Sequence, residues 1–220
     1  MVIVSLKKTR KIPLNGVSLT GHIISVKNND IIEFESSLER DFAYTLEYNT
    51  SVLSYCEQPI QIEYFNKNRK CIYTPDFYIK YFDNHQEIVE IKYENDLVEN
   101  ARDYENKFNA AREFCINNNL VFKVLTEKYI NANEVFNCRF LSYYKNPTTP
   151  INFGDIEIIL NKLKRFKRIT VKLLLEECSS DLERKAEFLY TIWYLVSNHL
   201  INFDKSEKLN MNTILVQGNE

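Results

Sequence analysis

The most constraining feature of the sequence is a change of hydrophobic period between residues 87 and 125. Over residues 87–93, one set of side chains (Ile88, Glu90 and Lys92) alternates with a second, apolar set (Val89, Ile91 and Tyr93), which is typical of a β-strand. Apolar residues then recur every three or four positions from Leu97 to Cys115, which predicts a long amphipathic helix. The mainly apolar run at residues 120–125 is typical of a buried strand that pairs in parallel.

The preceding segments complete a predicted α/β core. Ser36 and Glu39 fit a capping box at the start of a helix that ends near Tyr48. Four runs of strand character precede the strand expected at residues 87–93, and they lie at residues 52–55, 60–65, 72–74 and 77–82. A turn is expected at residues 67–70. We expect these strands to form an antiparallel meander. The order helix, strands, helix, strand predicts a mixed sheet with flanking helices that ends near residue 130.

Two further regions flank this core. Residues 1–33 are interpreted as an N-terminal arm with a basic start, and residues 1–146 as one domain. Beyond the prolines at 147 and 150 the sequence predicts three helices and a β-hairpin, at residues 155–166, 170–177, 182–198, 200–203 and 214–216. This order predicts a winged-helix-like domain over residues 147–220.

Charge and cysteine content restrict the class of protein. The formal net charge is −2, so DNA contacts must come from local patches. Two basic clusters qualify, and both also fit an ordinary solvated surface: Lys7, Lys8, Arg10 and Lys11, and Lys162, Lys164, Arg165, Lys167, Arg168 and Lys172. The five cysteines form no CxxC pair, and no apolar run approaches 18 residues. We therefore expect a cytoplasmic protein without a membrane partner.

Catalytic chemistry is predicted where Pro75-Asp76 is followed by Glu90-Ile91-Lys92. Two carboxylates on adjacent strands, with the Ile91 carbonyl, supply the oxygen ligands that Mg²⁺ prefers. Lys92 then orients or deprotonates the attacking water of a phosphodiester hydrolysis. The alternative is that Glu90 and Lys92 form a polar strand face and Asp76 is a turn residue.

Two more residues are candidates for this site. Glu39 is a possible third acidic ligand because it lies one position away from the apolar face of its helix, although it also fits a simple cap. Gln58, in Glu57-Gln58-Pro59, is a weaker candidate for contact with the site or DNA. A buried turn amide explains Gln58 equally well.

An ordered series of blocks carries a family resemblance. The blocks are Ser36-Ser37-Leu38-Glu39-Arg40-Asp41-Phe42, Leu46-Glu47-Tyr48, Val52-Leu53-Ser54-Tyr55-Cys56-Glu57-Gln58-Pro59, Tyr73-Thr74-Pro75-Asp76-Phe77 and Glu90-Ile91-Lys92. Over residues 35–130 the chain resembles the TnsA-type endonuclease subunit of heteromeric, TnsABC-like transposases. The resemblance implies a restriction-endonuclease-like fold of the PD-(D/E)xK superfamily. It places the family's catalytic glutamate, aspartate and lysine on Glu39, Asp76 and Lys92, while Glu90 stands where some members carry a non-acidic residue.

The resemblance also implies a reaction and partners. Enzymes of this family cut the strand at the 5′ ends of a mobile element, beside an integrase-like transposase subunit and an AAA+ ATPase regulator. The leading hypothesis is therefore a transposase subunit that uses two Mg²⁺ ions, or Mn²⁺ in their place, on double-stranded transposon ends. The alternatives are a stand-alone restriction-like or junction-resolving nuclease, and a DNA- or protein-binding scaffold with a nuclease fold.

Overall fold

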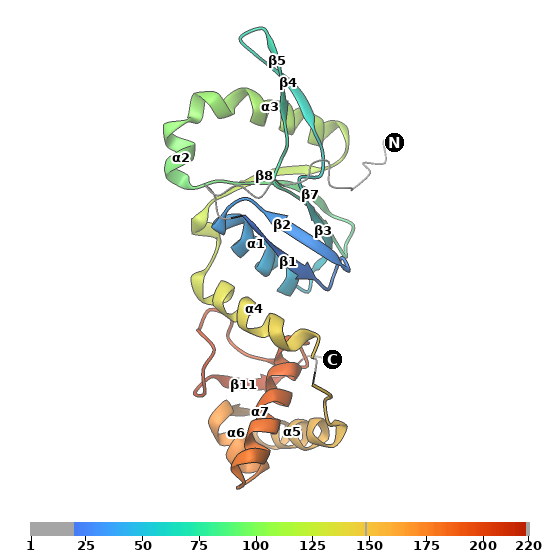
Figure 1. Cartoon of the computed structure of the whole chain (residues 1–220), viewed down its shortest axis with the longest axis vertical. Helices are drawn as coiled ribbons and strands as arrows, with labels where there is room; N and C mark the ends of the chain where they lie inside the picture. Colours follow the sequence, from blue (N-terminus) through green and yellow to red (C-terminus); the bar gives the residue numbers. More distant parts are fainter. Residues whose placement is uncertain (1–19, 148, 219–220) are drawn as a thin grey trace. The chain divides into compact units, whose positions relative to one another are not determined.

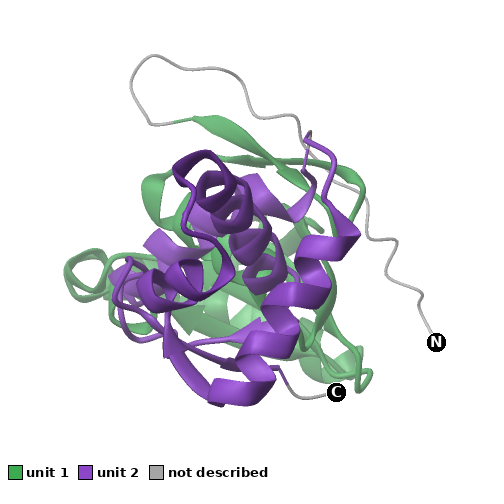
Figure 2. Ribbon diagram, turned by 90° about the horizontal axis from the view of Figure 1, so that it is seen from below, with its two compact units in different colours: residues 1–130 green, residues 131–220 purple. Residues whose placement is uncertain are grey.

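The computed structural model describes residues 20–147 and 149–218. They divide into two compact units between Ile130 and Asn131 (Figure 2). This division precedes the boundary predicted near residue 147, because the intervening helix belongs to the second unit. The basic cluster predicted at residues 7–11 lies outside the described residues.

Unit 1 is built on a four-stranded sheet with the strand order β3-β6-β7-β8 (Figure 1). The strands are β3 (Val52–Glu57), β6 (Phe77–Tyr81), β7 (Gln86–Ile91) and β8 (Val121–Leu125). The first three pair antiparallel, and β8 pairs in parallel with β7. The predicted mixed sheet and the parallel pairing of the last strand are confirmed.

Helices and a hairpin cover the two faces of this sheet. On one face, α1 (Ser37–Tyr48) and the hairpin of β1 (Gly21–Ser25) and β2 (Asp30–Phe34) share a core with the sheet, where the rings of Phe42 and Phe77 lie 5.4 Å apart. The residues predicted as the end of an N-terminal arm are therefore part of the fold. On the other face, Cys115 packs with Tyr78 and Ile88.

The predicted long helix is two helices. They are α2 (Glu94–Glu99) and α3 (Ala101–Asn117), separated by Asn100 in a non-helical conformation. Asn100 donates its side-chain amide to Asp96 Oδ1 at 2.7 Å. Asparagine competes in this way for local hydrogen bonds, which disfavours a helix interior. The prediction of one uninterrupted helix was wrong at this residue.

The strands β4 (Ile62–Asn66) and β5 (Arg69–Tyr73) form a separate two-stranded hairpin. The predicted meander was therefore wrong, because β3 pairs with β6 and the hairpin is inserted between them. The apolar side chains at its base explain this arrangement. Ile62 and Tyr73 are buried against Phe108 of α3 and not within the main sheet.

Unit 2 contains the C-terminal helices and a three-stranded antiparallel sheet of order β10-β11-β9. Its elements are α4 (Ala132–Lys145), α5 (Phe153–Phe166), β9 (Arg168–Thr170), α6 (Val171–Cys178), α7 (Leu182–Ser197), β10 (Ile201–Asn202) and β11 (Ile214–Gln217). The helix α4 and the strand β9 were not predicted. Asn137 of α4 accepts from Leu209 N at 2.9 Å and donates to the Glu207 carbonyl at 2.8 Å, which ties α4 to this unit.

None of the helices in residues 20–147 and 149–218 is both long and apolar enough to cross a bilayer.

Candidate active site

Asp76 lies directly before β6, at the point where the β4–β5 hairpin returns to the main sheet. Its carbonyl accepts from the Gln58 N–H at 2.8 Å, which joins the end of β3 to the start of β6. Its carboxylate Oδ2 accepts from the Ile91 N–H at 2.7 Å, at the end of β7. Backbone contacts therefore fix Asp76 beside the Glu90-Ile91-Lys92 segment.

The ammonium of Lys92 lies among the oxygen atoms predicted to bind metal. Lys92 Nζ is 3.4 Å from Asp76 Oδ2, 3.1 Å from Glu90 Oε1 and 3.0 Å from the Ile91 carbonyl oxygen. The Lys92 N–H also donates to the Leu125 carbonyl at 3.1 Å, which holds this residue against β8. The structure thus gathers two carboxylates and a carbonyl around a single positive charge.

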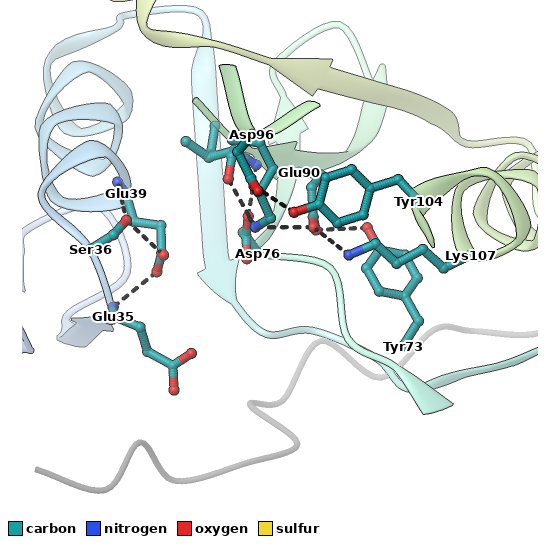
Figure 3. Close-up of polar contacts among 11 residues, drawn as sticks. Glu35, Ser36, Glu39, Tyr73, Asp76, Glu90, Asp96, Tyr104 and Lys107 are labelled. Carbon is teal, nitrogen blue, oxygen red and sulfur yellow. Dashed lines mark hydrogen bonds and ion pairs between the residues drawn. The ribbon is translucent and has the colours of Figure 1, made fainter. Parts of the chain in front are cut away.

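Glu90 has two further partners that the sequence analysis did not identify as site residues. The side chain of Glu90 is 2% exposed, and its Oε2 accepts from the Tyr73 hydroxyl at 2.7 Å. Lys107 Nζ of α3 lies 3.4 Å from Glu90 Oε1 and 4.3 Å from the centre of the Tyr104 ring (Figure 3). A buried carboxylate is thus held by a hydroxyl and two ammonium groups.

A sequence signal for Lys107 exists in the period of its helix. Residues three positions apart share a helix face, so Lys107 lies on the same side as Tyr104. It also directly precedes Phe108, a member of the apolar stripe. A lysine on the covered side of a helix must direct its charge to an acidic partner, and Glu90 is that partner.

Glu39 occupies the cap of α1. Its N–H donates to Ser36 Oγ at 3.1 Å, and its carboxylate accepts from the Glu35 N–H at 3.0 Å and from Ser36 Oγ at 2.8 Å. These contacts match the predicted capping box in residues, except that the carboxylate accepts from the backbone N–H of Glu35 and not from that of Ser36. Figure 3 shows these contacts on α1, separate from the contacts around Asp76 and Glu90.

Electrostatics nevertheless connects Glu39 to the cluster. Burial raises the pKa of Glu39, and the positive charge of Lys92 opposes that shift. Burial also raises the pKa of Asp76 well above its ordinary value, with added repulsion from Glu90 and, more weakly, from Glu39. Glu39 is therefore within the electrostatic field of the site without a contact to Asp76, Glu90 or Lys92.

The charge state of Lys92 follows from the same cluster. Burial disfavours its ammonium, but the carboxylates of Asp76 and Glu90 outweigh burial and raise the pKa of Lys92 above its ordinary value. The pKa of Tyr73 is raised by burial and by Glu90, so its hydroxyl keeps its proton and remains a donor.

The donor set can be tested against the needs of a metal ion. Mg²⁺ takes hard oxygen ligands, usually one or two carboxylates together with water and phosphate oxygens. Asp76, Glu90 and the Ile91 carbonyl supply such oxygens, and these already surround one cation. Among the described residues, no group of three or more His, Cys, Asp or Glu side chains has metal-binding geometry, which agrees with the separate position of Glu39.

Gln58 lies at the edge of this arrangement. It is buried, has a positive φ of 47° and contacts Asp76 through the backbone hydrogen bond already described. Left-handed backbone is uncommon for a residue with a Cβ, and here it turns the chain from β3 into the hairpin. The contact of Gln58 with Asp76 is thus a hydrogen bond between backbone atoms.

Comparison with known proteins adds evidence on ancestry. Residues 49–127 match the family model described as the TnsA-like endonuclease N-terminal domain. A search of curated proteins found no match. The matched segment contains Asp76, Glu90, Lys92, Tyr73 and Lys107, whereas Glu39 precedes it. A domain of this family implies a nuclease of Tn7-like transposition that acts on DNA. The chain therefore carries a TnsA-like endonuclease domain, and its resemblance to the TnsA-type endonucleases of Tn7-like transposases is confirmed.

Proposed function

We propose that this protein is a magnesium-dependent DNA endonuclease that cuts the strand at the 5′ ends of a mobile element. The observation that carries the proposal is the convergence of Asp76 Oδ2, Glu90 Oε1 and the Ile91 carbonyl on Lys92 Nζ. This cluster lies within the segment that matches an endonuclease family.

Each residue of the cluster has a role in this proposal. Asp76, Glu90 and the Ile91 carbonyl would hold Mg²⁺, and Glu39 would complete the acidic set by direct or water-mediated contact. Bound Mg²⁺ neutralises charge that develops on the phosphate and makes water a better nucleophile. Tyr73 and Lys107 are positioning residues, because the Tyr73 hydroxyl and the Lys107 ammonium each contact the buried Glu90 carboxylate.

Lys92 has the charge and position to act on the scissile phosphate. Since neighbouring carboxylates raise its pKa, the side chain is a cation at neutral pH in the state described here. A cation that is already aligned stabilises the negative charge of the pentavalent phosphate. We therefore favour charge stabilisation and water orientation by Lys92 over proton abstraction.

Unit 2 is proposed to bind a partner or DNA. The order α5, β9, α6, α7, β10, β11 and the antiparallel sheet support a winged-helix-like domain. The basic residues from Lys164 to Lys172 are exposed, while Lys162 pairs with Glu177 at 3.2 Å. An integrase-like transposase and an AAA+ ATPase are the protein partners that the family resemblance suggests. The net charge of −2 favours dependence on a partner for DNA targeting.

Cleavage of double-stranded transposon ends by the full chain, with its partners present, tests the proposal. Mg²⁺ and Mn²⁺ should support cleavage, whereas Ca²⁺ should support binding with little turnover. Asp76→Asn keeps an acceptor for the Ile91 N–H and removes the negative charge, so it should abolish cleavage with an unchanged fold. The proposal is wrong if Asp76→Asn cuts at the wild-type rate, or if wild-type protein binds no divalent ion in calorimetry.

A further inference from the structure

The β4–β5 hairpin extends from the candidate site to an exposed tip, and in Figure 1 it projects past α3. Its last residue, Tyr73, contacts Glu90, so the hairpin and the site share one structural base. From Tyr73 to Asn68 the strand advances by about 17 Å at the usual rise per residue. That length is about half of a helical turn of DNA.

The two faces of the hairpin differ. Cross-strand pairs that include Ile62 with Tyr73 and Asn66 with Arg69 share the face toward α3, where Asn106 donates to Asn66 at 3.4 Å. The opposite face carries the pairs Phe65 with Lys70 and Glu63 with Ile72. The side chains of Phe65 and Ile72 on this outer face are 69% and 60% exposed.

The tip of the hairpin is positively charged. Residues 66–70 contain Lys67, Arg69 and Lys70 and no acidic residue, in a chain whose net charge is −2. Lys70 is paired with Glu63 at 2.7 Å. Among the described residues, no ion pair is found for Lys67 or Arg69, and both are exposed. Both charges are therefore accessible at the end of the hairpin, that of Lys67 in the turn and that of Arg69 on the face toward α3.

The turn places a lysine in a backbone conformation that lysine rarely adopts. Lys67 and Asn68 have φ angles of 46° and 63°, the pattern of a tight turn between right-twisted strands. Asn and Gly are the preferred residues for such a turn, and left-handed backbone is unfavourable for lysine because of its Cβ. An exposed lysine thus stands in the turn of the hairpin, although another residue suits the backbone better.

From these observations, and resting on the proposed function, we propose that the β4–β5 hairpin is a DNA-binding ribbon that holds duplex DNA beside the site. A two-stranded ribbon fits the major groove of B-DNA, and Lys and Arg contacts to phosphate supply affinity. Lys67 and Arg69 contact phosphates, while the exposed ring of Phe65 packs against sugars or base edges. The charge of the tip is complementary to the phosphate backbone.

The test measures duplex affinity of the full chain in Ca²⁺, where binding is separated from cleavage. Lys67→Glu and Arg69→Glu should each weaken binding by about tenfold or more and reduce the salt dependence by about one phosphate contact. Phe65→Ala should weaken binding without a change in salt dependence. The matched control is Lys80→Glu at the distal end of β6, which reverses the same charge and should change affinity by less than about twofold.

The control for correct folding is Lys67→Asn, which removes the charge and puts a preferred residue into the turn. It should keep or raise the Tm and still weaken DNA binding. The hairpin proposal is overturned if the tip variants bind DNA like wild type, or if Lys80→Glu weakens binding as much as they do. If the hairpin proposal fails in this way but the wild-type protein cleaves DNA in Mg²⁺, the proposed function stands. If the wild-type protein does not cleave DNA in Mg²⁺, the proposed function itself is refuted.

Discussion

Lys107 of α3 and Glu90 of β7 form an ion pair of 3.4 Å in which the two side chains are only 17% and 2% exposed. The same ammonium lies over the rings of Tyr104 and Tyr73, at 4.3 Å and 5.1 Å from their centres. The aromatic contacts hold the charge of Lys107 next to the carboxylate. Lys107 therefore reduces the negative charge that Glu90 offers to a metal ion.

Removal of this positive charge should strengthen metal binding. Lys107→Met keeps the apolar stem and should tighten Mg²⁺ binding by about threefold to tenfold, because a nearby cation no longer opposes the ion. Isothermal titration with Mg²⁺ measures the effect. Lys123→Met is the matched control, since Lys123 pairs with Glu87 at the other end of β7. Unchanged or weaker Mg²⁺ binding in Lys107→Met would contradict this role.

The two roles of Glu39 can be separated by substitution. Glu39→Gln keeps a side-chain acceptor for the Glu35 N–H, so the capping box should persist with little loss of stability. If Glu39 also serves the metal site, Glu39→Gln should lower the cleavage rate by about 10²-fold. Glu39→Ala should in addition destabilise the fold by about 1 kcal/mol.

Thermal unfolding and cleavage of both Glu39 variants provide the readout. Wild-type cleavage by Glu39→Gln would restrict Glu39 to the cap of α1.

Lys92→Arg distinguishes charge stabilisation from proton abstraction. Arginine keeps the positive charge but does not release a proton near neutral pH. At saturating DNA, we expect Lys92→Ala to reduce the rate by about 10²-fold or more and Lys92→Arg to retain a substantial part of it. Equal loss in both variants would point to a base or to a steric requirement, and full activity in both would remove Lys92 from the mechanism.

The raised pKa of Asp76 predicts how stability depends on pH. Because its pKa in the folded protein is higher than in the unfolded chain, Asp76 stabilises the fold at acidic pH, and this contribution is lost as pH rises through the raised value. Without divalent ions, the Tm should fall over that range. Asp76→Asn should flatten the profile.

Mg²⁺ should reverse the effect of pH, since it binds the ionised carboxylate and stabilises the folded state. Calorimetric scans between about pH 5 and 8, with and without Mg²⁺, measure both changes. A wild-type profile that is flat over this pH range without Mg²⁺ would contradict the raised pKa of Asp76. A profile that Mg²⁺ leaves unchanged would contradict metal binding at this carboxylate.

Local sequence determined much of the fold. The strand character of residues 87–93 and the apolar run at 120–125 predicted two strands and their parallel pairing. The predicted burial of the second strand was wrong, because β8 lies at the edge of the sheet and its residues are exposed or only partly buried. The capping box at Ser36 and Glu39 is likewise a local interaction. Asp76, Glu90 and Lys92 were identified as a group from their spacing and from the family resemblance.

Tertiary structure decided the partners of those elements. The β4–β5 hairpin leaves the main sheet because Ile62 and Tyr73 find a better apolar surface on α3, a contact between distant parts of the chain. The same packing brings Lys107 to Glu90, which no pattern within either segment contains. Tertiary contacts also determine where unit 1 ends, since the hydrogen bonds of Asn137 assign α4 to unit 2. Local period specifies an element, whereas burial of its apolar face against a distant neighbour specifies its position.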